Sequence, residues 1–330
     1  MKIEIKPFDS GNLNEICRIH NQAFSEWIET LGMLYGYRKV TKTDVKKWVE
    51  PNNADILVAF EDEVPIGFLH YQILKTKGAG EGDDISCMEI IETIEGRGQS
   101  KIAVLPEKRR NGAAIKLLRQ ALTISKEQNI DIVTIYAYSH NQAINNILHE
   151  LSFNHEPIFY YPPFSNSKPY THDLVLAEFD LSKEIPPQQD GLIDNITIRE
   201  YQPTDLADIR QIFIECRPDM IENSSETEIG AYWVEENWAQ KTLVADVKGE
   251  VIGCMEYNKH GLIGIPGVKK NHQSKGIGSL LLHQLLLDMK SNGYTKALAD
   301  TGVILLNAIN LYRKLKFDVS RELWAWVKVL

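Results

Sequence analysis

Two segments of the chain combine residue types that bind phosphate groups. Residues 104–118 and 268–282 both follow the pattern V-x-x-x-x-[RQ]-x-x-G-x-[AG]-x-x-L-L. In each, an apolar strand leads into a glycine-bearing turn and an amphipathic helix, whose first amides have no intrahelical partner and carry the positive end of the helix dipole. Such a helix start attracts anions, and its glycines let a pyrophosphate approach the backbone closely.

The order of residues in this loop argues against two common nucleotide-binding motifs. Lys275 precedes Gly276, whereas the Walker loop of nucleoside triphosphatases requires Gly-Lys-[Ser/Thr]. Leu281 stands where the dinucleotide motif requires its third glycine. A nucleotide-binding module is therefore disfavoured. Taken alone, the pattern leaves open another phosphate ligand or a glycine-rich helix start that binds nothing.

The two segments are parts of a longer repeat. Gly112 and Gly276 are 164 residues apart, and the same offset separates Phe153 from Phe317. The hairpin sequence at 242–257 repeats an earlier one at an offset of 186. Separate landmarks with one offset indicate a gene duplication. The fall from 186 to 164 predicts a longer segment in the first half, between its third strand and its glycine loop.

The hydrophobic periodicity predicts which elements position these loops. In the first half we expect strands at 3–5, 55–60, 64–71, 101–105, 130–136, 157–163 and 173–179, a loop at 78–84, a helix burying Ile16, Ile19, His20 and Ala23, a helix after Gly112 burying Ile115, Leu118, Leu122 and Ser125, and a helix at 141–151. In the second half we expect strands at 196–199, 242–257 (a hairpin), 261–267 and 295–299, and helices at 205–216, 227–238, 276–289 and 305–315.

This order indicates a mixed α/β fold in two domains. The predicted domains are 1–180 and 195–330, joined by a linker at 181–194 whose paired prolines and glycine cannot continue a helix or a central strand.

The loop pattern and a second motif together resemble a known family. The sequence [RQ]-x-x-G-x-[GA], between a strand and a leucine-rich helix, is followed at 308–317 by A-x-x-L-Y-x-x-L-x-F. Both are similar to the coenzyme A loop and last helix of the GNAT superfamily of N-acetyltransferases, although Lys316 stands where the family usually has glycine. The resemblance covers nearly the whole chain as two tandem GNAT-like domains, an architecture similar to that of mycothiol synthase.

The resemblance implies a fold and a cosubstrate. Each domain is expected to have a central mixed, mostly antiparallel sheet flanked by helices, and the cosubstrate is acetyl-CoA with no metal. The residues expected to bind coenzyme A are Val268, Gln273, Ser274, Lys275, Gly276, Ile277, Gly278, Ser279 and Asn307 in the second domain, and Val104, Arg109, Arg110, Asn111, Gly112, Ala113 and Ala114 in the first. The family opens its sheet where Pro266 and Gly267 stand here, which places the amide near Val268 against the thioester oxygen. The alternative is an ordinary edge strand.

The resemblance also implies catalytic roles in the second domain. Tyr312 matches the family's tyrosine that protonates the leaving thiolate, a suitable role for a phenol. The first candidate for the general base is Glu256 and the second is His260. The fourth strand of this domain holds no acid, unlike that of many relatives. Core packing of Tyr312 and a solvated position of Glu256 are the alternatives.

The first domain departs from this pattern at both catalytic positions. Leu148 stands at the position of Tyr312, and His70 stands at that of Glu256. We therefore expect a degenerate domain that binds coenzyme A weakly or not at all and helps to shape the substrate cleft.

Several aromatic residues can line a substrate pocket, and the alternative for them is ordinary packing in the core or on the surface. They are Trp27, Tyr35, Tyr37 and Trp48 in the first half, and Trp233 and Trp238 in the second.

The composition sets limits on partners and location. The net charge of −9 argues against a nucleic-acid partner. The four cysteines form no C-x-x-C pair, so we expect reduced, buried thiols in the cytoplasm. No signal peptide or membrane-spanning segment is expected.

Taken with the family resemblance, the sequence predicts an N-acyltransferase acting on an amine of a small molecule or peptide. The alternatives are two catalytic domains, or a non-catalytic coenzyme A-binding or scaffold protein.

Overall fold

The chain forms two compact units. The computed structural model describes residues 2–25, 39–76, 85–90, 92–94, 97–99, 102–159, 171–187, 196–216, 239–264 and 267–330. One unit comprises Met1–Leu174 with Arg321–Leu330, and the other comprises Val175–Ser320. Some predicted features lie outside the described residues, namely the loop at 78–84, the helix at 227–238, the second half of the linker (188–194), Pro266, and the aromatic residues Trp27, Tyr35, Tyr37, Trp233 and Trp238.

The elements of the first half follow the predicted order with several additions. In chain order they are β1 (Ile3–Pro7), α1 (Leu13–Ala23), α3 (Lys42–Val49), β2 (Ala54–Glu61), β3 (Val64–Thr76), β4 (Ile85–Ile90), β5 (Glu92–Ile94), β6 (Arg97–Gln99), β7 (Ile102–Val104), α4 (Ala113–Glu127), β8 (Ile132–Tyr138), α5 (Gln142–Glu150), β9 (Asn154–His155), β10 (Ile158–Phe159), β11 (Thr171–His172) and β12 (Leu174–Asp180).

The second half repeats the same plan. Its elements are β13 (Thr197–Glu200), α6 (Leu206–Cys216), β14 (Ala239–Val247), β15 (Glu250–Asn258), β16 (Gly267–Val268), α9 (Ile277–Ser291), β17 (Lys296–Gly302), α10 (Leu306–Lys314) and β18 (Asp318–Val329). Among the described residues, no helix has both the length and the apolar character needed to cross a bilayer.

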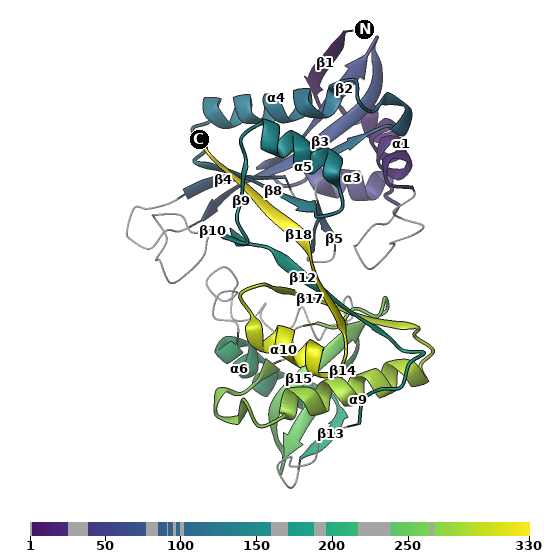
Figure 1. Cartoon of the computed structure of the whole chain (residues 1–330), viewed down its shortest axis with the longest axis vertical. Coiled ribbons are helices and arrows are strands. Elements are labelled where there is room, and N and C mark those ends of the chain that lie inside the picture. The colour runs from purple at the N-terminus through teal and green to yellow at the C-terminus, as the bar shows by residue number, and fades with distance from the viewer. Residues whose placement is uncertain are drawn as a thin grey trace. The chain divides into compact units, whose positions relative to one another are not determined.

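A mixed sheet forms the centre of the first unit. Its strand order is β1-β2-β3-β4-β8-β18, in which β4 and β8 are parallel and the other neighbours antiparallel. The helix α4 covers one face, where Ser125 contacts Met88, and α1 and α3 cover the other, where Trp48 packs against Phe68 (Figure 1). The predicted fold, a mostly antiparallel mixed sheet flanked by helices, is confirmed.

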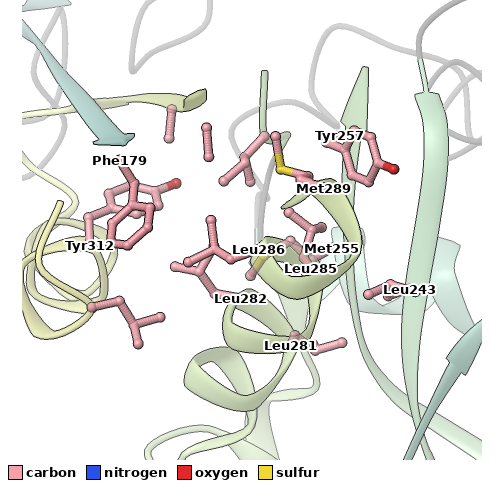
Figure 2. Packing of buried hydrophobic residues seen from close by; sticks show 14 of the residues in the cluster. Phe179, Leu243, Met255, Tyr257, Leu281, Leu282, Leu285, Leu286, Met289 and Tyr312 are labelled. Carbon is pink, nitrogen blue, oxygen red and sulfur yellow. The ribbon is translucent and has the colours of Figure 1, made fainter. Parts of the chain in front are cut away.

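The sheet of the second unit has the order β13-β14-β15-β16. One face packs on α9, and the other packs on α6. The apolar residues of α9 recur with helical spacing and are fully buried, which stabilises the unit by about 1.5–3 kcal/mol for each large side chain. Figure 2 shows these residues, which include Leu281, Leu282, Leu285, Leu286 and Met289.

Each unit takes its last strand from the other half of the sequence. Leu323–Val329 of β18 pairs along β8 in the first unit, from Leu323↔Tyr138 to Val329↔Ile132. In the second unit β12 lies next to β17, and its Ala177 and Phe179 belong to the core around α9. The compact units therefore differ from the boundaries expected from the repeat, since residues 175–180 and 321–330 have changed places.

The strand before the second glycine loop contains a bulge. Tyr257 of β15 faces Ile263, and four residues earlier Gly253 faces Val268, five residues after Ile263. One extra residue therefore lies opposite β15, as in a β-bulge. Among the described residues, this strand pairs with β17 on its other side through the parallel bridge Leu262↔Leu298, and β16 is the last strand of its sheet.

The first unit has a much larger interruption at the same place. Gln72 of β3 faces Glu89, and five residues earlier Gly67 faces Val104, fifteen residues after Glu89. Ten extra residues thus lie between β4 and β7, where the second unit has one. Together with a longer β3–β4 hairpin, this excursion accounts for the extra length predicted in the first half.

The duplication is also visible in the backbone conformation. Among the described residues, all positions with positive φ except Gly261 occur in pairs separated by the sequence offsets of 164 or 186. The pairs are Asp62 and Lys248, Glu63 and Gly249, Arg110 and Ser274, Gly112 and Gly276, Asn129 and Gly293, and Ser152 and Lys316. The two copies have kept the same turns while their residue types have diverged.

Two local predictions are tested directly. The predicted face of α1 is confirmed, since its buried residues are Ile16, Ile19, His20 and Ala23. The predicted face of α4 is partly wrong. Ile115 and Leu122 are only half-buried, and the small residues Ala113 and Ala121 are buried against the sheet instead. The buried residues are Ala113, Leu117, Leu118, Ala121 and Ser125. Alanine lets the helix approach the sheet, which a pattern of large apolar residues does not reveal.

All four cysteines are free, two of them buried and two half-buried.

Replacing Lys316 with glycine should stabilise the protein. Lys316 has a φ of 64°, a left-handed conformation that glycine adopts without the cost that a Cβ imposes. We expect the free energy of unfolding to rise by about 0.5–1 kcal/mol, after allowing for the greater chain entropy of glycine. In the control Lys314→Gly, the exposed residue is the last one of α10, and the substitution should cost up to about 1 kcal/mol. A loss of stability in Lys316→Gly, measured by chemical denaturation, would contradict this account.

Candidate active site

The glycine loop of the second unit presents the free end of a helix. Gly276 has a φ of 85° and begins α9 after a short helical turn at Lys270–His272. The helical ladder starts with Leu280 N, which donates to Gly276 O at 3.0 Å, so the amides of the three residues between them lie ahead of the ladder. The first turn holds no acid, and Lys275 beside it is exposed. This helix start is suited to an anion.

The predicted coenzyme A residues of the second unit surround this helix start. The exposed ones are Gln273, Ser274 and Lys275, the half-buried ones are Val268, Gly276, Gly278 and Ser279, and Ile277 is buried. The side chain of Leu311 on α10 would lie 3.6 Å from a Cβ at Gly278, so α10 packs beside the start of α9. Asn307 is exposed in the first turn of α10.

The equivalent loop of the first unit has the same backbone but different chemistry. Gly112 has a φ of 87° at the start of α4, yet the side chain of Asn111 accepts a hydrogen bond from Ala113 N at 3.0 Å. The buried carboxylate of Glu61 pairs with Lys108 close by. Hydrogen bonds from Lys108 and, more weakly, from Asn111 keep the pKa of Glu61 below its usual value.

Two of these differences, the Asn111 cap and the Glu61 carboxylate, disfavour an anion at the first loop, whereas Lys108, Arg109 and Arg110 make residues 108–111 of that loop more basic than residues 272–275 of the second one. At the equivalent positions the second unit has Lys275 for Asn111, His272 for Lys108 and Val247 for Glu61. The first loop therefore occupies one of its own amides and places a negative charge nearby. The other predicted residues of this loop do not remove that obstacle: Arg109 donates to Ala23 O at 2.6 Å, Arg110 is exposed, Ala114 is half-buried, and Val104 is half-buried in β7.

The backbone of Val268 faces the open edge of the second sheet. Lys269 N donates to Ile252 O at 2.9 Å, so the peptide groups of its neighbour Val268 point away from β15. Val268 O accepts hydrogen bonds from Gln273 Nε2 at 3.0 Å and from Cys216 Sγ at 3.1 Å. This edge lies directly before the glycine loop, in the orientation that the predicted thioester contact requires.

A close contact with α6 fixes the strand at this edge. A Cβ at Gly267 would lie 2.4 Å from Ile212 Cγ2 on α6. Only glycine fits there without moving the helix or the strand. The glycine that the sequence singled out at the bulge thus also allows α6 to pack against the strand.

Tyr312 lies in an aromatic group within the core of the second unit. It is 1% exposed, and its ring centroid lies 5.4 Å from that of Phe317, which is also 5.4 Å from that of Phe179 (Figure 2). Burial alone fits both readings of Tyr312, as a core residue and as an acid in a dry site. Leu148, its counterpart in the first unit, is fully buried in α5.

Glu256 lies on the face of the second sheet that carries α6. It pairs with Thr242 across β14 and is 1% exposed, so the alternative of a solvated strand face is wrong. Burial, followed by the charge of Glu256, raises the pKa of the neighbouring Cys254 thiol well above its usual value. His260, the second candidate base, is half-buried in the turn after β15. His70, the counterpart of Glu256 in the first unit, donates a hydrogen bond from Nε2 to Trp48 O at 2.9 Å.

The sequence reasoning missed one titratable residue of the first unit. Glu89 lies in β4, a strand that was not predicted, and burial raises its pKa from 4.5 to about 7. Among the described residues, burial accounts for this shift. The alternating run I-S-C-M-E-I at 85–90 is the signal that could have revealed the strand.

The pKa of Glu89 makes stability depend on pH in a defined direction. Because its pKa is raised in the folded state, the folded chain binds more protons than the unfolded one between pH 4.5 and about 7. The contribution of Glu89 to the free energy of unfolding is fully present below pH 4.5 and is lost as the pH rises through 7, by at most about 3 kcal/mol.

Glu89→Gln should remove this loss. The variant is expected to gain stability over the wild type between pH 5 and pH 8, as followed by urea denaturation. The exposed carboxylate of Glu127 provides the control Glu127→Gln, which should show no such trend. An equal pH dependence in wild type and Glu89→Gln would rule out a raised pKa at Glu89.

Comparisons with known proteins agree with the duplicated architecture. The acetyltransferase (GNAT) family matches residues 13–153 and again residues 206–317. The fold is similar to that of a tandem GNAT protein from the clavulanic acid biosynthesis pathway, with a TM-score of 0.65 and 14% identity over 99% of this chain and 98% of that one. It is also similar to a GCN5-related N-acetyltransferase from Sphaerobacter thermophilus, with a TM-score of 0.62 and 14% identity over 99% and 95%. No curated protein matches the chain.

The two family matches cover most of the chain, and each contains one copy of the glycine loop. Their bounds include the strands that precede the two loops, β7 and β16, and the helices α5 and α10. The chain therefore belongs to the GNAT acetyltransferase family, in a tandem form.

Proposed function

We propose that this protein is an acyl-CoA-dependent N-acetyltransferase whose second unit is catalytic. The observation that carries the proposal is the helix start at Gly276, which has free amides and no acid, next to the open edge at Val268. The proposed acceptor is the amine of a small molecule or peptide. The four free cysteines support a cytoplasmic location.

Acetyl-CoA supplies the acetyl group as a thioester. The helix start holds its pyrophosphate through the amides of Ile277, Gly278 and Ser279, and Lys275 adds a positive charge. Val268 supplies the edge peptide along which the pantetheine arm extends, once Gln273 and Cys216 have released the carbonyl. Asn307 lies near this path in the first turn of α10.

The reaction moves two protons. The acceptor amine forms a C–N bond to the acetyl carbonyl carbon, and the C–S bond breaks. Glu256 takes the proton that the amine loses, Tyr312 gives its phenol proton to the departing thiolate, and the amide near Val268 stabilises the oxyanion. His260 is the alternative base. The buried positions of Glu256 and Tyr312 support these roles, because a dry site strengthens the effect of both groups.

In this proposal the first unit does not transfer acyl groups. Its loop amide is capped by Asn111, the Glu61 carboxylate lies close by, and Leu148 replaces the tyrosine. The rival proposal of two catalytic units requires coenzyme A binding at this loop, and a scaffold protein requires no turnover at either one. The two following experiments separate these possibilities.

The two loop glycines allow a matched test. Gly276→Asp and Gly112→Asp both place a carboxylate at a left-handed helix start of the same geometry, so they strain the backbone alike. Only Gly276→Asp should repel the pyrophosphate, raising KM for acetyl-CoA at least tenfold in an acetylation assay. Gly112→Asp should leave KM unchanged. If Gly112→Asp is the impaired variant, the first unit is the one that binds acetyl-CoA.

The phenol of Tyr312 can be tested with a second tyrosine of the same unit. Tyr312→Phe should lower kcat by about 10²-fold with little change in KM, because an acid acts only in the transition state. In the control Tyr257→Phe the lost hydroxyl donates to Asp288 Oδ2 at 2.7 Å, away from the proposed chemistry, so kcat should hold. A kcat near the wild-type value in Tyr312→Phe would show that Tyr312 is a packing residue.

A further inference from the structure

The carbonyl oxygen of Val268 accepts hydrogen bonds from two side chains that belong to different elements. Gln273 Nε2 in the glycine loop donates to it at 3.0 Å, and Cys216 Sγ at the end of α6 donates to it at 3.1 Å. The amide of Gln273 also reaches Cys216 Sγ at 3.6 Å, so the three groups form a closed triangle. A carbonyl oxygen has two lone pairs, and these two donors satisfy both.

The thiol of Cys216 has the properties of a donor that gives way easily. Burial raises its pKa, and the hydrogen bonds with Val268 and Gln273 oppose this rise only in part. The thiol therefore keeps its proton at neutral pH. An S–H group is nevertheless a weak donor compared with the amide of Gln273. Of the two bonds to Val268 O, the bond from Cys216 is the one that breaks at the lower cost.

Other contacts hold α6 against this part of the chain without the thiol. Lys270 N donates to Glu215 Oε2 at 2.7 Å, directly before Cys216. Lys269 Nζ forms an ion pair with Asp208, near the start of α6, at 2.8 Å. The helix is therefore fixed from its first turn to its last. The hydrogen bond of Cys216 can break without moving α6.

The first unit closes the same place with different chemistry. The helices α1 and α6 both have eleven residues and bury equivalent positions, which places Ala23 at the position of Cys216. Arg109 stands at the position of Gln273 and donates to the backbone oxygen of Ala23 at 2.6 Å. Alanine has no side-chain donor. A side-chain hydrogen bond from this helix position to the strand is therefore possible in the second unit and not in the first.

We propose that Cys216 tunes the affinity of the second unit for acetyl-CoA by competing with pantetheine for the carbonyl oxygen of Val268. This inference rests on the proposed function, in which the pantetheine arm extends along this edge. The amide N–H groups of pantetheine are donors, and they reach this oxygen only after the thiol has turned away. Cys216 is thus a positioning residue, which acts on the strand edge and not on the reacting atoms.

The competition has a cost and a benefit. Binding exchanges the bond from Cys216 for a bond from pantetheine, so the net gain is smaller than it would be at an oxygen with a free lone pair. In return, the thiol keeps the polar oxygen of a strand edge satisfied and the strand in the position that the arm requires. A residue that only packs would have neither effect.

The test is calorimetric titration of the full-length chain with acetyl-CoA, which needs no acceptor. Cys216→Ala removes the competing donor, so the Kd of acetyl-CoA should fall about threefold. Cys216→Ser restores a donor and should return the Kd to the wild-type value or above it. The control Cys17→Ala removes a half-buried thiol from α1 of the first unit and should bind like the wild type.

A second titration uses 3′-phospho-ADP, the nucleotide part of coenzyme A, which lacks the pantetheine arm. Its Kd should be the same in the wild type and in both Cys216 variants, which also shows that the variants are folded. An acetyl-CoA Kd in Cys216→Ala at or above the wild-type value would overturn the inference, as would an equal fall in Cys216→Ser or in the Kd of 3′-phospho-ADP. If the wild type binds no acetyl-CoA, the proposed function itself is wrong, and this inference is wrong with it.

Discussion

The close approach of a helix start to an open strand edge is the constraint on which the rest of the second unit depends. Gly276 turns the chain into α9, and Gly253 of β15 lets that helix come close, since a Cβ there would lie 3.2 Å from Ile277 Cγ2. The bulge before β16 keeps the edge free of β17. The uncapped amides at the helix start, the edge position of Val268 and the packing of α10 beside the loop all follow from this arrangement.

The duplication shows that a backbone can be kept while its residue types change. Both glycine loops have the same left-handed positions, but Asn111 caps the amide of Ala113 in the first loop, and Lys275 stands at the position of Asn111 in the second. The carboxylate of Glu61 lies close to the first loop, where the second unit has Val247. The two halves thus share a fold and differ in the side chains around the helix start.

Local patterns in the sequence predicted much of this structure. Short-range spacing of residue types predicts the buried face of α1, the paired hairpins and the position of both glycine loops. Each of these features depends on residues that are close together in the sequence. The exchange of β12 and β18 between halves was beyond such reasoning, because strand partners are set by tertiary packing. The strand at Ile85–Ile90 was missed because the repeat was aligned on the second unit, where the bulge has one residue instead of ten. Glu89 was missed with it.

The central claim is that one unit of two binds acetyl-CoA, and its most direct test is the stoichiometry of binding. Calorimetric titration of the wild-type chain with acetyl-CoA counts sites without any assumption about the acceptor. The account predicts one site per chain. Two sites of similar affinity would contradict the loss of anion binding in the first unit, and the absence of binding would contradict the acetyltransferase function itself.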